Sequence, residues 1–178
     1  SMCLAGPDGD RLSTPKKVLL GTDLAQVLRT HMERLERVIQ VLPPQDFWWR
    51  PHEESLSIGM ILLHLEGNIR QWVLAGLGGV EDTRQRASEF SGQSTKSAVQ
   101  VFDDLSSTHA RSLDVIASIE DQDLSQEHTI QGYLVTTQAA ILHVTEHFSW
   151  HVGQAVWIAK ARAGKGHGLA FYDDDQLG

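Results

Sequence analysis

Apolar side chains recur every three or four residues in four separate stretches of this chain, and this helical period constrains the fold more than any other feature. Pro43 follows the first stretch, Gly76 the second and Gly164 the fourth, and each of these residues is typical of a helix end. Ser97 and Gln100 have the spacing of a capping box at the start of the third. We therefore predict four helices, over residues 22–42, 58–73, 97–119 and 136–164.

Strand signals are weak, because the run Tyr133-Leu134-Val135 is too short to build a sheet alone. The sequence therefore predicts an all-α four-helix bundle. Its second and third connectors are long, so we expect at least one long crossover connection. We also expect a flexible arm over residues 1–20, the bundle over 21–165 and a weakly ordered tail over 166–178.

Charge and cysteine content narrow the function. The net charge is −8, and nucleic acids and anionic membranes are bound largely by basic side chains, so neither partner is expected. Cys3 is the single cysteine, which excludes an intrachain disulfide framework and fits a reducing compartment. No run reaches the ~18 apolar residues of a membrane span. We expect a cytoplasmic protein.

Three of the nine histidines, His143, His147 and His151, follow one another at four-residue spacing on the fourth predicted helix. At 1.5 Å rise per residue, the first and last lie about 12 Å apart, too far to share one metal ion. Helical geometry places His147 and His151 on the apolar stripe and turns His143 to its flank. Two such imidazoles need hydrogen-bond partners or a metal.

A metal bound to that pair needs a further ligand from a facing helix, and the helical candidates are His31, His64 and His109. Periodicity alone does not choose among them, although the position of His109 on its stripe favours a core or interhelical hydrogen bond. The alternative for the pair is two core histidines with hydrogen-bond partners.

A competing motif, H-x-x-E-H, spans His143 to His147 and would make Glu146 the general base of an inverted zinc peptidase. That site requires a further carboxylate ligand, and the sequence does not identify one.

Several motifs give the chain a family resemblance. The fourth predicted helix contains H-x-x-x-H-x-G-Q, from His147 to Gln154. Trp49-Arg50-Pro51 precedes the second, which carries His64 within H-L-x-G-N, and R-x-R-x-x-E-F begins at Arg84. The chain thereby resembles the DinB superfamily, of the DinB/YfiT type, and in particular an uncharacterised branch of it. The resemblance extends over residues 24–162.

The resemblance implies a metal site formed by His64, His147 and His151, with zinc, nickel or iron as the divalent ion. Three neutral imidazoles leave a coordination position open, as in catalytic sites. It further implies a metal-dependent thiol S-transferase or related isomerase that acts on a small-molecule substrate with a low-molecular-weight thiol. Val152 stands where relatives usually have a polar residue, so no role is carried over to that position.

Polar residues near these histidines have two interpretations each. Asn68 and Gln154 could orient the imidazoles or a ligand, or could form interhelical hydrogen bonds. Arg84, Arg86 and Glu89 could line the mouth of the site or clamp the connector through surface ion pairs. The tryptophans at positions 48, 49 and 72 suit packing better than a substrate box.

A second function class remains open, a non-catalytic metal-binding or stress-associated helical protein that forms a homodimer. Its basis is the wide apolar arc of the fourth predicted helix, which Trp150, Trp157 and Ala161 extend toward a dimer face.

Overall fold

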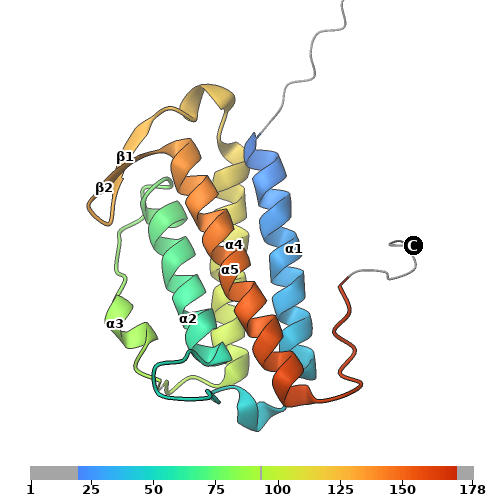
Figure 1. The fold of residues 1–178 in the computed structure, drawn as a ribbon. Coiled ribbons are helices and arrows are strands. Elements are labelled where there is room, and N and C mark those ends of the chain that lie inside the picture. Colours follow the sequence, from blue (N-terminus) through green and yellow to red (C-terminus); the bar gives the residue numbers. More distant parts are fainter. Residues whose placement is uncertain (1–19, 93, 172–178) are drawn as a thin grey trace, which may run out of the picture.

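Four long helices form a bundle in the computed structural model, which confirms the predicted fold class (Figure 1). The structure describes residues 20–92 and 94–171. The long helices are α1 (Leu20–Val41), α2 (Ile58–Ile69), α4 (Ala98–Ser118) and α5 (Thr137–Ala163). Apart from Leu20, the predicted arm lies outside the described residues, as does the tail beyond Phe171.

Helix ends follow the sequence signals closely. Ser97 and Gln100 form the predicted capping box of α4, each side chain binding the other residue's backbone N–H. At the start of α5, the Thr136 hydroxyl accepts a hydrogen bond from the Ala139 N–H at 3.2 Å. Gly164 follows α5 with a φ of 75°, a value that glycine adopts without strain.

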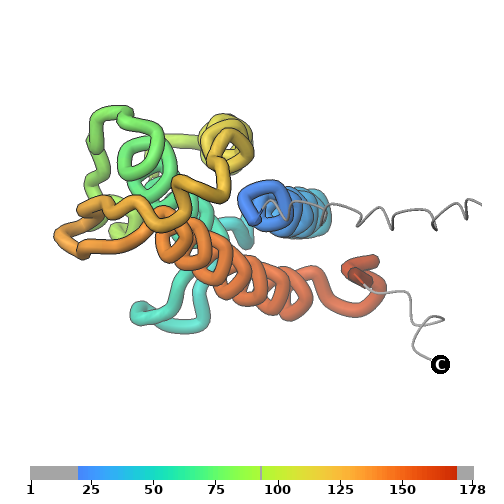
Figure 2. The backbone as a smooth tube through the Cα atoms, turned by 90° about the horizontal axis from the view of Figure 1, so that it is seen from above, coloured from blue at the N-terminus to red at the C-terminus, as the bar shows by residue number. Residues whose placement is uncertain are grey.

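The bundle contains the expected crossover. Helix α2 packs against α5, α4 packs against α1, and α2 and α4 also pack against each other. Helices α2 and α4 run in the same direction (Figure 1). The connector between them must therefore return along the full length of the bundle. It carries the short helix α3 (Arg86–Glu89) along the outside of α2, as the view from above also shows (Figure 2).

The absence of a sheet was predicted wrongly, because a small antiparallel hairpin precedes α5. Strands β1 (Glu127–Ile130) and β2 (Tyr133–Thr136) pair with Ile130 opposite Tyr133. Gln131 and Gly132 connect them with φ values of 55° and 81°, and positive φ at both positions is typical of a type I′ turn. The buried Ile130 anchors the hairpin to the bundle.

The second predicted helix changes its winding before it ends. After Ile69 it continues as a π-helix, η2 (Arg70–Ala75). The buried Trp72 lies in this segment and contacts His143, with the ring centroids 4.0 Å apart and the ring planes tilted by 37°. Two 3-10 helices complete the described elements, η1 (Pro44–Asp46) and η3 (Asp121–Asp123).

The first residues after α5 fold back against α1. Leu169 is buried, Arg37 donates a hydrogen bond to the Gly168 carbonyl at 3.1 Å, and its guanidinium lies 4.7 Å from the Phe171 ring centroid. None of the described helices is long and apolar enough to cross a membrane.

Candidate metal centre

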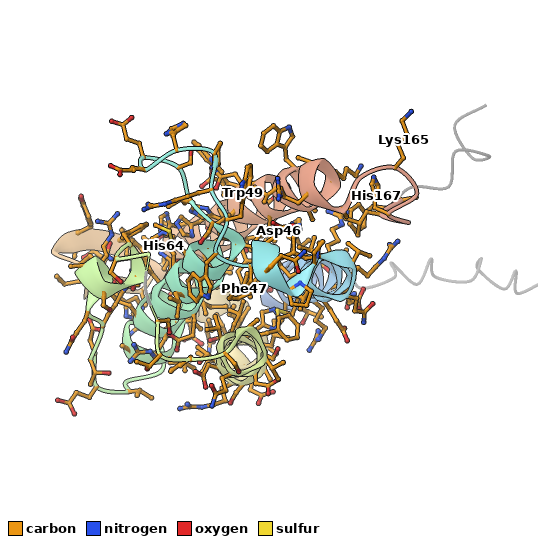
Figure 3. The ribbon with its side chains drawn as sticks, turned by 90° about the horizontal axis from the view of Figure 1, so that it is seen from below. Asp46, Phe47, Trp49, His64, Lys165 and His167 are labelled. Carbon is orange, nitrogen blue, oxygen red and sulfur yellow. The ribbon has the colours of Figure 1, made fainter. Side chains whose placement is uncertain are left out.

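Helices α2 and α5 bring together the three histidines that the resemblance singled out. His64 projects from α2 toward His147 and His151, and one ring nitrogen from each residue lies within 4.8 Å of the other two. The Nε2 atoms of His64 and His147 are 3.0 Å apart. His167 lies beyond the end of α5, far from His64 (Figure 3). The fold therefore assembles this cluster from residues 83 positions apart.

Hydrogen bonds outside the cluster fix two of the three rings. The Nδ1 atom of His64 lies 2.8 Å from Glu89 Oε2, and that of His151 lies 2.7 Å from Gln154 Oε1. Both oxygens are acceptors, so each Nδ1 carries the proton and donates it. Each Nε2 then keeps its lone pair on the side that faces the cluster. This is the tautomer in which an imidazole binds a metal through Nε2.

Burial keeps two of the three histidines, His147 and His151, neutral. Burial, together with the neighbouring His151, His64, His143 and Arg84, lowers the pKa of His147 to about 3. The pKa of His151 is also lowered, by burial first and then by His64, although the hydrogen bond to Gln154 opposes the shift. Neutral imidazole is the form that binds metal ions.

The acceptor for His64 comes from α3, on the crossover. Burial alone would raise the pKa of Glu89, but hydrogen bonds from Arg84 and His64 lower it overall. Arg84 donates two of these, from Nε to Oε1 at 2.7 Å and from a terminal nitrogen to Oε2 at 2.8 Å. A third donor of Arg84 binds Gln71 Oε1 at 2.9 Å. The carboxylate is therefore ionised, and it accepts from both Arg84 and His64.

A glycine makes room for this ion pair. A Cβ atom at Gly67 would lie 2.2 Å from Glu89 Oε1 and 3.0 Å from Arg84 Nε. Any larger residue at position 67 would push the carboxylate away from His64. Close approach of the crossover to the helix thus depends on Gly67.

Sequence reasoning did not identify Glu89 as the partner of His64. It left Arg84 and Glu89 either at the mouth of the site or in surface ion pairs, and the structure instead places a buried ion pair directly behind a histidine of the cluster. The signal was present, because a histidine in an apolar helix needs an acceptor for its second ring nitrogen. Arg86 lies over Phe90, with its guanidinium 5.0 Å from the ring centroid.

Other predicted candidates lie elsewhere. His143 contacts the Trp72 ring outside the cluster, and Glu146 is exposed, so the arrangement does not support the inverted zinc-peptidase motif. His109 is buried and donates from Nε2 to the Leu28 carbonyl at 3.1 Å, the interhelical hydrogen bond that its position favoured. His31 is also outside the cluster.

The two polar residues that were candidates for orienting the imidazoles, Asn68 and Gln154, differ in their contacts. Gln154 binds His151, as expected for an orienting residue, whereas Asn68 is buried without a hydrogen bond to any of the three histidines in the described structure. Trp49 packs under Arg162, whose guanidinium lies 4.5 Å from its ring centroid. Trp48 makes an edge-on contact with Phe47 at 5.0 Å, so these tryptophans pack the connector as expected.

The donor set suits a divalent metal ion. Two nitrogen ligands about 2.1 Å from one zinc ion lie about 3.4 Å apart in tetrahedral geometry. The observed separations, from 3.0 Å between two Nε2 atoms up to 4.8 Å, bracket this value. Imidazole ligands bring no negative charge, so a bound ion would keep its full charge to act on a further ligand.

Comparison with solved structures supports the same fold. A conserved protein from Enterococcus faecalis aligns with a TM-score of 0.68 and 16% identity, covering 83% of this chain and 99% of that one. A DinB-like protein from Bacillus subtilis gives 0.63 and 16%, covering 85% and 97%. A DinB-like protein from Bacillus cereus gives 0.61 and 16%, covering 78% and 89%.

Comparison with curated protein sequences gives no match. A family profile described as "Protein of unknown function (DUF1572)" matches residues 20–168, which include all four long helices and the histidine cluster. The chain therefore belongs to the DUF1572 family and has the fold of DinB-like proteins, in agreement with the superfamily that its motifs predicted.

Proposed function

We propose that His64, His147 and His151 bind one divalent metal ion and that the protein uses this site to join a low-molecular-weight thiol to a small-molecule substrate. One observation carries the metal site: three imidazoles converge, and Glu89 and Gln154 accept hydrogen bonds from the Nδ1–H groups of two of them. The resemblance to the DinB superfamily supports the thiol chemistry. Zinc, nickel and iron(II) are all compatible with the nitrogen donors.

A bound divalent ion would supply a Lewis acid that favours deprotonation of a thiol or of water. The chain's own groups prepare the site for that role. Glu89, held by Arg84, accepts a hydrogen bond from the Nδ1–H of His64. This bond makes the Nε2 lone pair of His64 a stronger electron donor to a metal ion. Gln154 orients His151 in the same way. The apolar surroundings of His147 exclude the proton that would compete with a metal ion.

Elemental analysis tests the metal site directly, on protein purified without chelators and without nickel resin. We expect about one divalent ion per chain in the wild type and little in His64→Ala, His147→Ala or His151→Ala. His143→Ala is the matched control, because His143 lies one turn from His147 on α5 and outside the cluster. Loss of metal in His143→Ala would instead support the peptidase motif, in which His143 and His147 are the metal ligands. Wild-type protein that cannot be loaded would refute the metal site.

Thiol transfer is tested separately, on metal-loaded protein. A thiol and a soluble electrophile are mixed with it, and the loss of free thiol is followed together with the formation of the new C–S bond by mass spectrometry. We expect turnover that is absent in His151→Ala and unchanged in His143→Ala. If the protein binds one metal ion per chain but turns over none of the thiols tested, it is a metal-binding protein and the proposed transferase activity is wrong.

A non-catalytic metal-binding homodimer is the second candidate. The observation that favours it is the exposure of Trp150 and Trp157, each 64% accessible on α5. Sedimentation velocity at micromolar concentration tests this candidate. A dimer that dissociates in Trp150→Ala would support it, and a monomer would refute it.

A further inference from the structure

A pocket of about 560 Å³ lies between α5 and the connector that precedes α2. This volume falls within the range of about 300–1,000 Å³ typical of small-molecule sites. One wall is the connector around Pro51 and Leu56, and the other is α5.

Gly153 indicates that this space is kept open. Glycine is unfavourable within a helix, and Gly153 lies in the interior of the 27-residue helix α5. At Gly59 and Gly67, a Cβ atom would clash with Trp48 or Glu89, so packing explains those helical glycines. At Gly153 a Cβ atom would meet nothing within 4 Å. Packing inside the protein therefore gives no reason for glycine here, whereas a ligand lying against the helix would.

Two indoles flank this glycine. Trp150 and Trp157 lie three positions before and four positions after Gly153, so all three belong to one side of α5. Both indoles are 64% exposed although both line the pocket. Large aromatic side chains left open to water around a concave space are typical of surfaces that bind flat apolar molecules.

Charge restricts the ligand further. Among the described residues that line the pocket, Glu54 is the one with a charged side chain, and the whole chain carries −8. Glu54 repels an anion, whereas the indole faces and the carboxylate both attract a cation. A neutral aromatic body also suits the lining, since Leu56 and Ile61 are apolar.

The pocket adjoins the metal centre. Gln154 lines the pocket and accepts the Nδ1 proton of His151, and Ile61 is one helical turn before His64. We propose that this pocket binds the body of the substrate, a small molecule with a flat apolar part and no negative charge, with its reactive end toward His151. The binding of the body is independent of the metal, and only the orientation toward His151 rests on the proposed function.

Three probes that share a naphthyl body test the charge preference: naphthylmethylammonium, naphthylmethanol and naphthoate. Each is titrated into the full-length protein by calorimetry, with and without bound zinc. We expect saturable binding of the cation and of the neutral alcohol, and about tenfold or more weaker binding of the anion. Glu54→Gln should reduce the difference between cation and anion. Binding that favours naphthoate, or no saturable binding of any probe, would overturn the proposal.

Variants locate the binding site. Gly153→Leu, which projects a side chain into the pocket, should abolish binding of the alcohol, and Trp157→Ala should weaken it about fivefold or more. Tyr133→Ala is the matched control, because Tyr133 is also 64% exposed but lies on the hairpin at the other end of the bundle (Figure 1). Circular dichroism confirms that each variant is folded. Equal weakening in Tyr133→Ala, or unchanged binding in Gly153→Leu, would refute the pocket.

The metal and the pocket can fail independently. If naphthylmethanol binds and zinc does not, the pocket stands and the proposed function falls. If zinc binds and no probe does, the pocket falls. If Trp157→Ala abolishes a dimer seen by sedimentation and no probe binds to the wild type, this face binds a second copy of the chain and the proposal is wrong.

Discussion

Replacing Glu89 with glutamine tests the link between the crossover and the metal centre. The change keeps the shape of the side chain but removes the charge that Arg84 contacts at 2.7 and 2.8 Å, and the Arg84 side chain is 2% exposed. Removing one partner of a buried ion pair destabilises a protein by about 3–5 kcal/mol, because the other charge is left buried and uncompensated. We expect the free energy of unfolding to fall by about that amount in Glu89→Gln.

The same change should weaken metal binding. Loss of the acceptor behind a metal-binding histidine typically reduces affinity by about 10–100-fold, which is about 1.4–2.7 kcal/mol. Glutamine can still accept from His64 through its amide oxygen, so we expect the lower part of this range. Urea unfolding measures the stability of the metal-free protein, and competition with a chelating dye at a temperature where the variant is folded measures zinc affinity.

Asp104→Asn is the matched control, because Asp104 forms an ion pair with Lys96 in which the two side chains are 48% and 52% exposed. An exposed pair contributes less than about 1 kcal/mol. A double variant with Arg84→Met and Glu89→Gln should recover part of the lost stability without recovering zinc affinity, since it removes the unpaired charge. If Glu89→Gln unfolds like Asp104→Asn and binds zinc like the wild type, the role assigned to the carboxylate is wrong.

Three further predictions follow from the site and the helices around it. The metal-free protein should lose stability as the pH falls from 6.5 toward 3, because the unfolded chain then binds a proton at His147 that the folded chain excludes. The midpoints of urea unfolding between pH 7 and pH 4 measure this loss, and it should be smaller in His147→Gln. Gly67→Ala should lower both the melting temperature and zinc affinity, because its Cβ would lie 2.2 Å from Glu89 Oε1. Gly153→Ala should instead raise stability by up to about 1 kcal/mol, seen as a higher melting temperature, because no steric clash offsets the gain in helix propensity.

Much of the fold could be predicted because its determinants are local. Ser97 with Gln100 defined the start of α4, since the two side chains satisfy N–H groups that a helix leaves unpaired. For α5 the sequence offered Thr136 or Thr137 as the cap, and the structure shows that it is Thr136. The hairpin before α5 was missed because its two strands have four residues each, half of them exposed, and give little hydrophobic alternation. Its strongest signal was the dipeptide Gln131-Gly132 at the turn. This signal is weak, because the residue before the glycine in a type I′ turn is most often Asn or Asp and here it is Gln.

The candidate site was predictable in part. Spacing along one helix singled out His147 and His151 and excluded His143, since helical geometry fixes the distances between residues on one cylinder. The position of His64 opposite them depends on how α2 packs on α5, and only the resemblance indicated it. Glu89 could not be placed because it reaches His64 through the path of a long connector, which no local pattern determines.

That path connects the topology to the chemistry of the site. In a bundle with short connections, the chain would turn directly from α2 into an antiparallel neighbour, and nothing would cross the outer side of His64. Here α2 and α4 are parallel, so the chain must run back along α2 before α4 begins (Figure 1). The return brings α3 against α2, where Gly67 leaves room for Glu89 to accept the Nδ1 proton of His64. The long crossover therefore does more than connect two helices, because it supplies the group that directs the His64 lone pair into the cluster.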